Sequence, residues 1–287
     1  MTKRVKIIVF SVLGTLFLIA LSMILFVVLG NTSIHVSKFE VKSDNLPSSF
    51  EGFKIAQVSD LHNEEFGKNN KRLLKKLSEC EPDIIAITGD LIDSRNTNLE
   101  VSLNFVKEAI KIAPCYYVTG NHEGRIDGYE QFENELKSIG VVVLDGRSSM
   151  VERNGEKITL YGIHDPESLK GEKYGYAERG IVEKLLKELD YSDTGYNILL
   201  SHRPECFDYY VEHKYDLVLT GHAHGGQFRL PFVGGLYAPG QGKFPKYDSG
   251  AFIENETTMV VSRGLGNSIF PFRINNTPEL VLITLTN

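Results

Sequence analysis

The segment Gly221-His222-Ala223-His224-Gly225-Gly226-Gln227 follows the apolar run Leu217 to Thr220 and is predicted to form a loop at the end of a strand. The imidazoles of His222 and His224, two residues apart and surrounded by small residues, can reach a single metal cluster from one side. Histidine is a common metal ligand, but it is also a common solvated residue. A glycine-rich surface turn with two incidental histidines is therefore the alternative, and other parts of the chain must decide.

Four other apolar runs also end in ligand-type residues. Open α/β sheets gather ligands at the carboxyl ends of their strands, so we expect these residues to meet at one rim. The segments are Ser59-Asp60-Leu61-His62 after Phe53 to Val58, Gly89-Asp90-Leu91-Ile92-Asp93 after Asp83 to Thr88, Gly120-Asn121-His122-Glu123 after Cys115 to Val118, and Ser201-His202-Arg203 after Tyr196 to Leu200.

The donor set predicts the kind of metal site. Oxygen and imidazole donors without a thiolate suit first-row divalent ions such as Mn, Fe, Co, Ni or Zn better than calcium. Seven or eight donors are too many for one ion. Two ions that share one carboxylate would use them all, at the roughly 3.5 to 4 Å separation of two-metal hydrolytic sites.

The chain after about residue 50 alternates between strand and helix patterns. Helical spacing is expected over 69–80, 98–112, 129–139 and 177–189. Asn154-Gly155 is expected to turn a hairpin between 150–153 and 158–161. This order predicts a mixed α/β domain with parallel strands at its centre. Further short strands are expected at 141–144, 251–254, 258–262 and 280–285, the last three antiparallel.

The N-terminus has the pattern of a membrane anchor. Lys3, Arg4 and Lys6 precede the uncharged stretch Ile7 to Gly30, which at about 1.5 Å per residue can cross a hydrocarbon core of roughly 30 Å. A cleaved signal peptide is the alternative, but Val28-Leu29-Gly30 matches its exit site poorly. The basic residues favour a cytoplasmic N-terminus. We predict a single-pass cell-membrane protein with cytoplasmic residues 1–6, a transmembrane anchor at 7–30, a connector and edge strand at 31–49, and an extracytoplasmic domain at 50–287.

The remaining composition excludes two classes of protein. The chain has 31 basic and 37 acidic side chains, and three of the basic ones precede the anchor, so the rest carries a net charge of about −9. Nucleic acid is therefore not expected as a partner, because its binding needs clustered positive charge. Cys80, Cys115 and Cys206 are widely spaced and odd in number, which predicts buried free thiols and no disulfide framework or thiolate zinc site.

The five ligand-bearing segments resemble, in order, the five blocks of the calcineurin-like metallophosphoesterases, and the likeness runs from about residue 50 to the C-terminus. Ser201 to Pro204, Gly221 to Gln227 and Arg263 to Gly266 are similar to a membrane-anchored bacterial branch whose phosphodiesterases include UDP-diacylglucosamine pyrophosphohydrolases. Ala223 stands where Thr or Ser is commoner in that branch, at a position that is not a ligand. The resemblance implies a four-layer sandwich of mixed central sheets flanked by helices, preceded by one transmembrane helix.

The resemblance also implies a role for each matching residue. His122 would be the proton donor, and Asp93 would orient residues behind the ligands. One ion would be held by Asp60, His62 and His224, the other by Asn121, His202 and His222, with Asp90 as the bridge.

These roles predict a membrane-anchored phosphoesterase that hydrolyses a phosphodiester, pyrophosphate or phosphomonoester with metal-activated water. His122, with an unperturbed pKa of about 6.5, can supply the leaving group's proton. A hydrolase of non-phosphorus esters or amides and an inactive membrane-tethered scaffold are the alternatives. The complete ligand set argues against the scaffold, and the lack of a Gly-x-Ser-x-Gly elbow argues against serine hydrolysis.

The expected substrate is a phosphorylated small molecule or a lipid at the membrane surface. Arg203 and Arg263 could contact phosphate, and His164 could line the cleft. The aromatic runs 228–237, 244–247 and 269–272 lie beside the metal-binding segment in Gly/Pro-rich chain. They are either core, as apolar residues usually are, or an apolar lip on which acyl chains rest.

Overall fold

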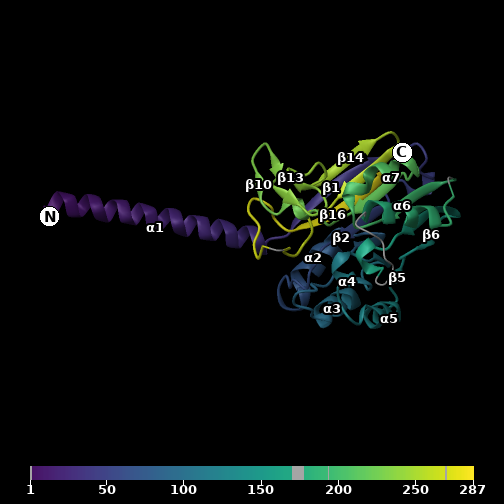
Figure 1. Ribbon diagram of the computed structural model, residues 1–287, viewed down its shortest axis with the longest axis horizontal. Helices are drawn as coiled ribbons and strands as arrows, with labels where there is room; N and C mark the ends of the chain where they lie inside the picture. The colour runs from purple at the N-terminus through teal and green to yellow at the C-terminus, as the bar shows by residue number, and fades with distance from the viewer. Residues whose placement is uncertain (1, 170–177, 193, 269) are drawn as a thin grey trace.

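Two six-stranded β-sheets pack face to face in the body of the protein (Figure 1), in a computed structural model that describes residues 2–169, 178–192, 194–268 and 270–287. The first sheet, in spatial order, consists of β1 (His35–Lys42), β16 (Glu279–Thr286), β2 (Lys54–Val58), β3 (Ile84–Thr88), β4 (Cys115–Val118) and β5 (Val142–Val143). The second consists of β14 (Gly250–Glu254), β15 (Thr257–Val261), β9 (Leu217–Thr220), β8 (Tyr196–Leu200), β7 (Glu156–Gly162) and β6 (Arg147–Arg153).

Helices cover the outer face of each sheet. The first sheet packs on α2 (Lys71–Glu79), α3 (Leu99–Ala109) and α5 (Tyr129–Ile139), and the second on α6 (Glu178–Glu188) and α7 (Phe207–Glu212). The result is the predicted four-layer sandwich of mixed sheets and flanking helices. Shorter elements are α4 (Asn121–Gly124), the one-turn helices Ser48–Phe50, Lys68–Asn70, Pro166–Ser168, Pro204–Cys206 and His224–Gly226, and the hairpins of β10 (Arg229–Leu230) with β11 (Gly234–Gly235) and β12 (Tyr237–Ala238) with β13 (Gly242–Lys243).

The uninterrupted apolar strands are explained by these layers. In β3, Ile85 and Ile87 pack towards the helices, whereas Ile84 and Ala86 pack towards the other sheet. Because successive side chains of a strand point to opposite faces, a strand buried on both sides needs apolar residues at every position. The three predicted free thiols are confirmed as buried and unpaired.

The central strands are parallel, as predicted: β2, β3, β4 and β5 in the first sheet, and β7, β8 and β9 in the second. The hairpin turn is also confirmed, because Asn154 and Gly155 adopt the positive φ angles of 52° and 85° that the turn requires. Of the 177–189 helix, Ala177 lies outside the described residues, and the rest agrees with α6.

The prediction that the last three strands are antiparallel is only partly right. β14 and β15 form an antiparallel hairpin, but β15 runs parallel to β9. The final strand, β16, crosses to the first sheet, where it lies antiparallel to β2 and parallel to β1. The apolar pattern of a strand shows that it is buried but not which sheet it joins, since the partner is chosen by the packing of the whole chain.

The predicted anchor is a single helix, α1 (Lys3–Thr32), that projects from the body and has no buried residue (Figure 1). Within the described residues it is the one helix long and apolar enough to cross a membrane, with a mean hydropathy of 2.9. The edge strand expected after it is β1, which lies at the rim of the first sheet. The side chain of Asn31, in the last turn of α1, accepts a hydrogen bond from the backbone N–H of Arg273 (2.6 Å) and donates to its carbonyl (2.9 Å).

The layer between the sheets should dominate stability. Ile198 is completely buried there, so Ile198→Ala is expected to lower the free energy of unfolding by about 2–5 kcal/mol through lost burial and the cavity it leaves. Ile253→Ala, on the exposed face of β14, is the matched control and should change it by less than about 0.5 kcal/mol. Denaturant titration of both variants measures the difference, and equal effects would contradict this assignment of the core.

Candidate metal centre

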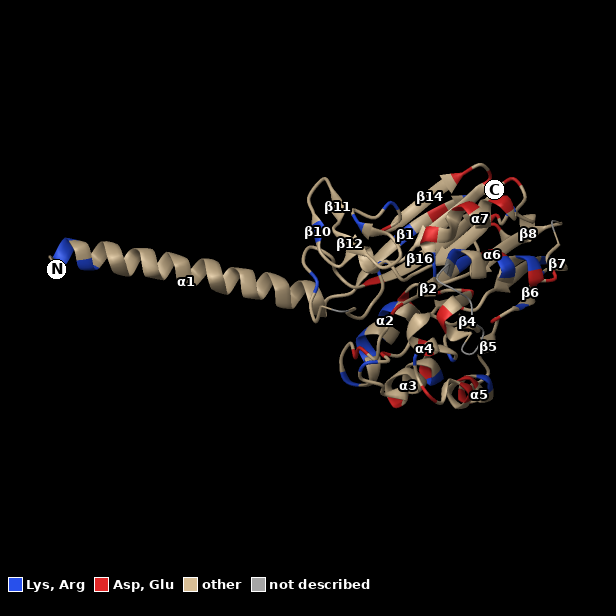
Figure 2. Cartoon of the chain, viewed as in Figure 1, with Lys and Arg blue, Asp and Glu red and all other residues tan. Residues whose placement is uncertain are grey.

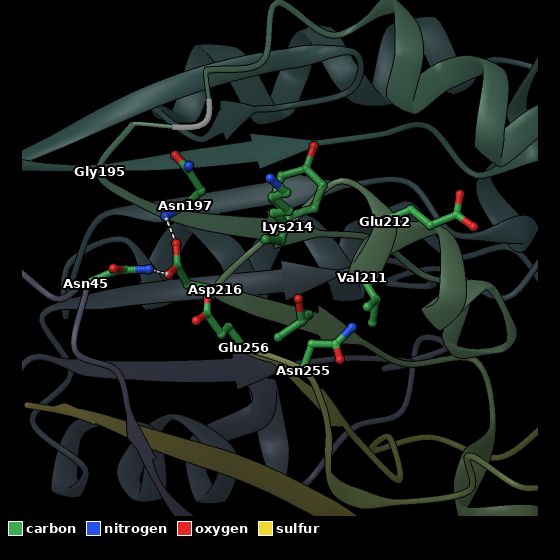
Figure 3. Close-up of a pocket in the computed structure, with 11 residues that line it drawn as sticks. Asn45, Gly195, Asn197, Val211, Glu212, Lys214, Asp216, Asn255 and Glu256 are labelled. Atoms are coloured by element: carbon green, nitrogen blue, oxygen red, sulfur yellow. Dashed lines mark hydrogen bonds between the residues drawn. The ribbon is translucent and has the colours of Figure 1, made fainter.

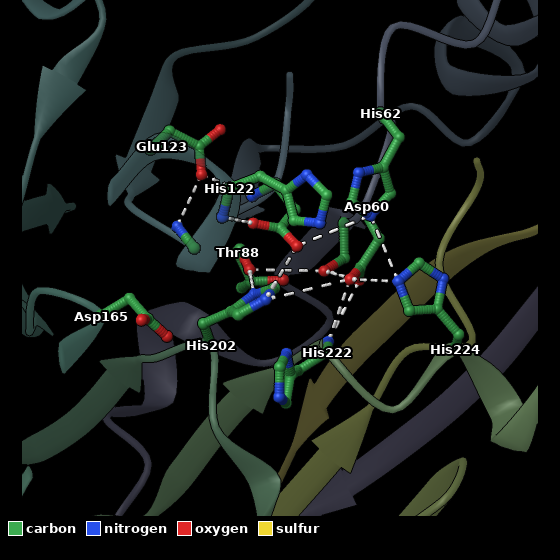
Figure 4. A network of polar contacts seen from close by, with 12 residues as sticks. Asp60, His62, Thr88, His122, Glu123, Asp165, His202, His222 and His224 are labelled. Carbon is green, nitrogen blue, oxygen red and sulfur yellow. Dashed lines mark hydrogen bonds and ion pairs between the residues drawn. The ribbon is translucent and has the colours of Figure 1, made fainter. Parts of the chain in front are cut away.

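The five predicted ligand segments converge where strands of the two sheets end. β2, β3 and β4 of the first sheet and β8 and β9 of the second deliver them to a common point, so the predicted rim is built from two sheets. Figure 4 shows the result, a set of buried imidazoles around buried carboxylates. The predicted ligands Asp60, His62, Asp90, Asn121, His202, His222 and His224 are all buried there, at 6 % exposure or less.

The first group of ligating atoms joins Asp60, His62, Asp90 and His224. The Nε2 atoms of His62 and His224 are 3.2 Å apart. Nε2 of His224 lies 3.3 Å from Asp60 Oδ1, and Nε2 of His62 lies 3.5 Å from Asp90 Oδ2. Lone-pair donors from three segments therefore point at the same small volume, as the ligands of one cation do.

The second group joins Asp90, His202 and His222. Asp90 Oδ2 lies 3.3 Å from Nε2 of His202, so this oxygen faces imidazoles of both groups. The amide of Asn121 lies 2.8 Å from Nδ1 of His222. If the amide nitrogen faces the ring, it donates a hydrogen bond to Nδ1 of His222. If the amide oxygen faces the ring, this oxygen and Nδ1 are two adjacent atoms that could both bind a cation.

Hydrogen bonds define which nitrogen of His202 is free. Nδ1 of His202 lies 2.7 Å from the carbonyl oxygen of Thr88, which can only accept, so Nδ1 carries the proton. The lone pair of Nε2 is then directed at Asp90 and at any cation beside it. A carbonyl behind the ring is the usual partner of a metal-binding histidine.

His122 has the opposite arrangement. Its Nδ1 accepts from the backbone N–H of Ser94 (3.0 Å), so the neutral ring carries its proton on Nε2. Its ring packs against that of His62 at 4.4 Å between centroids. To act as an acid the ring must take a second proton on Nδ1, which would break the hydrogen bond from Ser94 and let Nδ1 donate to Asp93 Oδ1, 3.4 Å away.

The ligand residues have strained backbones. Asp60, His62, Asp90, His222 and His224 have φ angles between 48° and 65°, in the left-handed region that non-glycine residues seldom adopt. Each such residue costs of the order of 1–3 kcal/mol unless its surroundings enforce it, and such residues cluster at functional sites. In this conformation, residues two apart in a short loop can direct their side chains towards the same centre.

Close backbone approach at the centre requires two glycines. A Cβ on Gly120 would overlap the Asp90 carboxylate, and one on Gly221 would overlap Ser59 and Asp60. Any larger residue at either position would push the aspartates out of place.

Glu123 is a site residue that the sequence argument missed. It is completely buried, and its carboxylate accepts from the backbone N–H groups of Asp90 (2.9 Å), Gly120 (2.8 Å) and Ile92 (3.3 Å). It therefore ties the loop after β3 to the loop after β4. Its place directly after His122 was the available signal, but only the fold shows that it points away from the cluster.

Arg273 was also missed, and nothing in the sequence around it indicates a role. Its side chain is fully buried and donates to the carbonyls of Arg263 (2.7 Å) and Gly266. Its guanidinium also lies 3.3 Å from Nδ1 of His224. Arg273 thus joins the metal-ligand loop to the segment held by the last turn of α1.

The chemistry of the cluster fits divalent cations. Burial raises the pKa of Asp60 to about 6, because a charged carboxylate is poorly solvated in the interior. Imidazole nitrogens and carboxylate oxygens face one another at 3.2 to 3.5 Å. Cations would stabilise the ionised carboxylates and satisfy the lone pairs of these atoms, and an N/O donor set of this kind suits first-row divalent ions.

The three candidate substrate contacts lie apart from the ligand groups or are held by carboxylates. Arg203 is buried and paired with Asp165 (2.5 Å), with one guanidinium nitrogen 3.1 Å from His222. Arg263 is paired with Glu279 (2.8 Å). His164 lies 3.7 Å from Asp145. Of the three, Arg203 is in direct contact with a predicted ligand.

A separate cavity lies at the opposite ends of β8 and β9 (Figure 3). It has a volume of about 590 Å³. Asp216 there accepts from the side chain of Asn45 (3.0 Å) and from the backbone of Asn197 (2.7 Å). Its lining contains no histidine, so it lacks the donor set of the metal centre.

Comparison with known proteins agrees with this geometry. Residues 53–226 match the family described as calcineurin-like phosphoesterase. The chain belongs to this family. It is 29% identical over 257 residues to an uncharacterized metallophosphoesterase, YkuE, of Bacillus subtilis, covering 88% of this chain and 85% of that protein. It is 27% identical to the phosphodiesterase YaeI of Escherichia coli, covering 81% and 82%.

Two further matches concern the anchor and the fold. A transmembrane protein with a metallophosphoesterase domain from Danio rerio is 30% identical and is covered over 56% of its length, against 86% of this chain. The sulfate thiohydrolase SoxB of Thermus thermophilus has a TM-score of 0.50 at 12% identity, covering 84% of this chain and 57% of that one, and supports the fold alone. As a member of this family, the protein is a metal-dependent phosphohydrolase.

Because Asp90 faces both donor groups, its substitution tests the predicted ligand set. Asp90→Ala removes an oxygen that faces both groups and is expected to lose both ions, whereas His122→Asn is expected to retain about two per chain. Metal analysis of the purified proteins, with circular dichroism to verify folding, measures this. His62, Asp93 and His122 also form a possible ligand group. Loss of an ion in His122→Asn would favour that group, and full occupancy in Asp90→Ala would exclude the bridge.

Proposed function

We propose that the chain is a membrane-anchored dinuclear phosphoesterase that hydrolyses a phosphodiester, pyrophosphate or phosphomonoester of a lipid or cell-envelope molecule. The observation that carries the proposal is the Asp90 carboxylate, whose Oδ2 faces His62 in one donor group and His202 in the other. In this proposal residues 1–6 are cytoplasmic, 7–30 span the cell membrane, 31–49 connect, and 50–287 form the extracytoplasmic catalytic domain.

Each residue has a role in the proposed reaction. Asp60, His62 and His224 would hold one ion, Asn121, His202 and His222 would hold the other, and Asp90 would be shared by both. Such ions supply an acidified water as nucleophile and positive charge for the phosphoryl oxygens. His122 presents Nε2 towards the leaving group, and Glu123 holds the loops of Asp90 and Asn121 in place.

The helix α1 and the sequence resemblance support a substrate at the membrane. α1 is wholly exposed and apolar, and its last turn is hydrogen-bonded to the body. The resemblance to UDP-diacylglucosamine pyrophosphohydrolases favours a lipid phosphoester or pyrophosphate. Arg203, which touches His222, is the one sequence-derived candidate contact placed beside a predicted ligand. Manganese is among the candidate ions, and reconstitution of the metal-free protein with each ion in turn will identify the one that supports activity.

Hydrolysis of bis-p-nitrophenyl phosphate is the direct test of this function. We expect turnover that is abolished by chelator and restored by Mn, and little hydrolysis of p-nitrophenyl acetate, because the cations stabilise phosphoryl charge. A preference for the acetate would support a hydrolase of non-phosphorus esters. Inactivity towards a panel of phosphate monoesters, diesters and pyrophosphates, at full metal occupancy, would support a tethered scaffold.

The role of His122 can be tested by changing the leaving group. If its ring donates a proton in the transition state, His122→Asn should slow alkyl phosphate esters at least about tenfold more than p-nitrophenyl esters, whose leaving group needs no proton. The comparison of kcat between both substrate types measures this. Equal slowing would mean that Nε2–H only positions the phosphate.

A further inference from the structure

An exposed apolar surface borders the anchor end of the body. It is formed by residues of the β10–β11 hairpin, the β13 region and the segment before β16. We refer to it as the apolar rim, and its members are Leu230, Phe232, Val233, Phe244, Phe270, Phe272 and Ile274, which are 38 to 108 % exposed. Among the aromatic runs singled out in the sequence, Ile269 lies outside the described residues.

The rim is one continuous surface. Phe228 lies beneath it and packs on Phe270 and Phe272 at 5.1 and 5.6 Å between ring centroids. It also pairs with Ile274, and its carbonyl accepts from Leu236. Segments more than thirty residues apart in the sequence are thereby held side by side. Of the two alternatives for these runs, core or an apolar lip, the exposure of the rim residues excludes core for them.

Exposure of the rim is costly in water. Phe232, at the tip of the β10–β11 hairpin, is fully exposed and has a φ angle of 65°, a conformation that a bulky residue rarely adopts. Exposed apolar patches of this kind mark sites of interaction with proteins or membranes. We therefore expect the rim to be covered by a binding partner.

Its position identifies that occupant. The two hydrogen bonds between Asn31 and Arg273 hold the segment of Phe272 and Ile274 against the last turn of α1. Figure 1 shows β10, β13 and the loop before β16 on the side of the body from which α1 projects. A helix that crosses a bilayer brings the residues at its end to the bilayer surface, so the rim adjoins the lipid.

The charge of the rim also suits a bilayer surface. Residues 225–248 include the lysines Lys243 and Lys246 and one ion pair, Arg229 with Asp248 (2.9 Å), so this segment has a positive net charge although the body as a whole is acidic. In Figure 2 acidic residues lie near β14 and the C-terminus and also near β6 and β7, away from the root of α1. Basic residues beside apolar side chains favour anionic head groups, whereas two such basic rims placed face to face would repel each other.

Side-chain hydrogen bonds connect the rim to the metal centre. The Gln227 side chain donates to the carbonyls of Phe270 (3.1 Å) and Phe272 (2.8 Å). The Asn276 side chain donates to the carbonyls of His224 (2.7 Å) and Gln227 (3.2 Å). The loop that carries the predicted ligand His224 is thus braced by the same segments that form the rim.

We propose that the apolar rim inserts into the interfacial layer of the bilayer crossed by α1, so that the body lies on the membrane with its His224 loop braced from the lipid side. Phe232 is the deepest residue in this arrangement, because it is fully exposed at a hairpin tip. Lipid acyl chains are the occupant of the rim.

The absence of tryptophan from the chain allows a direct measurement. Phe232→Trp places a single fluorophore in the rim, and Met150→Trp places one on the exposed strand β6, on the far side of the body from α1. The full chain is reconstituted, one copy per disc, into nanodiscs of phosphatidylcholine and phosphatidylglycerol. A matched set contains phosphatidylcholine brominated near the head-group end of its acyl chains, which quenches only fluorophores in contact with it.

We expect the tryptophan emission of the Phe232→Trp variant to shift to the blue and to fall at least about twofold in the brominated discs, with the emission of the Met150→Trp variant unchanged. Equal, weak quenching of both variants would overturn the proposal. A blue shift without quenching would assign the rim to protein contact and would overturn it as well. Melting temperatures of both variants close to that of the parent chain are the control for folding.

A second measurement rests on the proposed function and is read separately from it. Phe232→Glu with Phe244→Glu is expected to leave turnover of soluble bis-p-nitrophenyl phosphate unchanged and to lower turnover of a phosphoester lipid in the same nanodiscs about tenfold or more. Equal turnover of the lipid by parent and variant would overturn a role of the rim in substrate access. Failure of the parent chain on every phosphoester would contradict the function while the quenching result stands.

Discussion

The negative charge of Asp90, buried between histidines of two different sheets, is the constraint on which the centre depends. Its Oδ2 is 3.5 Å from His62 and 3.3 Å from His202. Isolating a carboxylate from water costs several kcal/mol unless positive charge accompanies it. The sandwich places this carboxylate where two sheets end together, so cations bound there would join the two halves of the fold as well as activate water.

This arrangement demands conformations that the backbone does not prefer. Five predicted ligands are held at positive φ, and glycines at 120 and 221 leave room for the aspartates. Rigid neighbours make the strain tolerable. Glu123 joins the loops after β3 and β4, and Nδ1 of His202 is held by Thr88 of the opposite sheet. A centre of this kind is preorganised, since its donors are positioned before the substrate arrives.

The contacts between anchor and body link location to chemistry. Asn31, in the last turn of the apolar helix, binds Arg273, whose guanidinium lies 3.3 Å from the predicted ligand His224. The apolar rim and the brace formed by Gln227 and Asn276 lie along the same path. A phosphoester whose apolar part remains in lipid would meet the metal centre at the membrane surface, which avoids the free-energy cost of exposing its acyl chains to water.

The sequence by itself determined the parts that local chemistry controls. Strand and helix positions followed from apolar periodicity, the Asn154-Gly155 turn from its φ requirement, and the anchor from an uncharged run. The seven ligand candidates were found because each follows a buried strand, and the structure brings all seven together. Their individual assignment to the two ions remains a prediction.

Only the tertiary structure decided what depends on partners distant in the chain. β16 crosses to the first sheet, and the tautomers of His202 and His122 are set by Thr88 and Ser94. Glu123 and Arg273 acquire their roles from loops far from them in sequence, and Phe232 is exposed although its residue type predicts burial. Residue type and spacing encode a side chain's chemistry, but its neighbours, and hence its charge state and exposure, come from packing free energy summed over the whole chain.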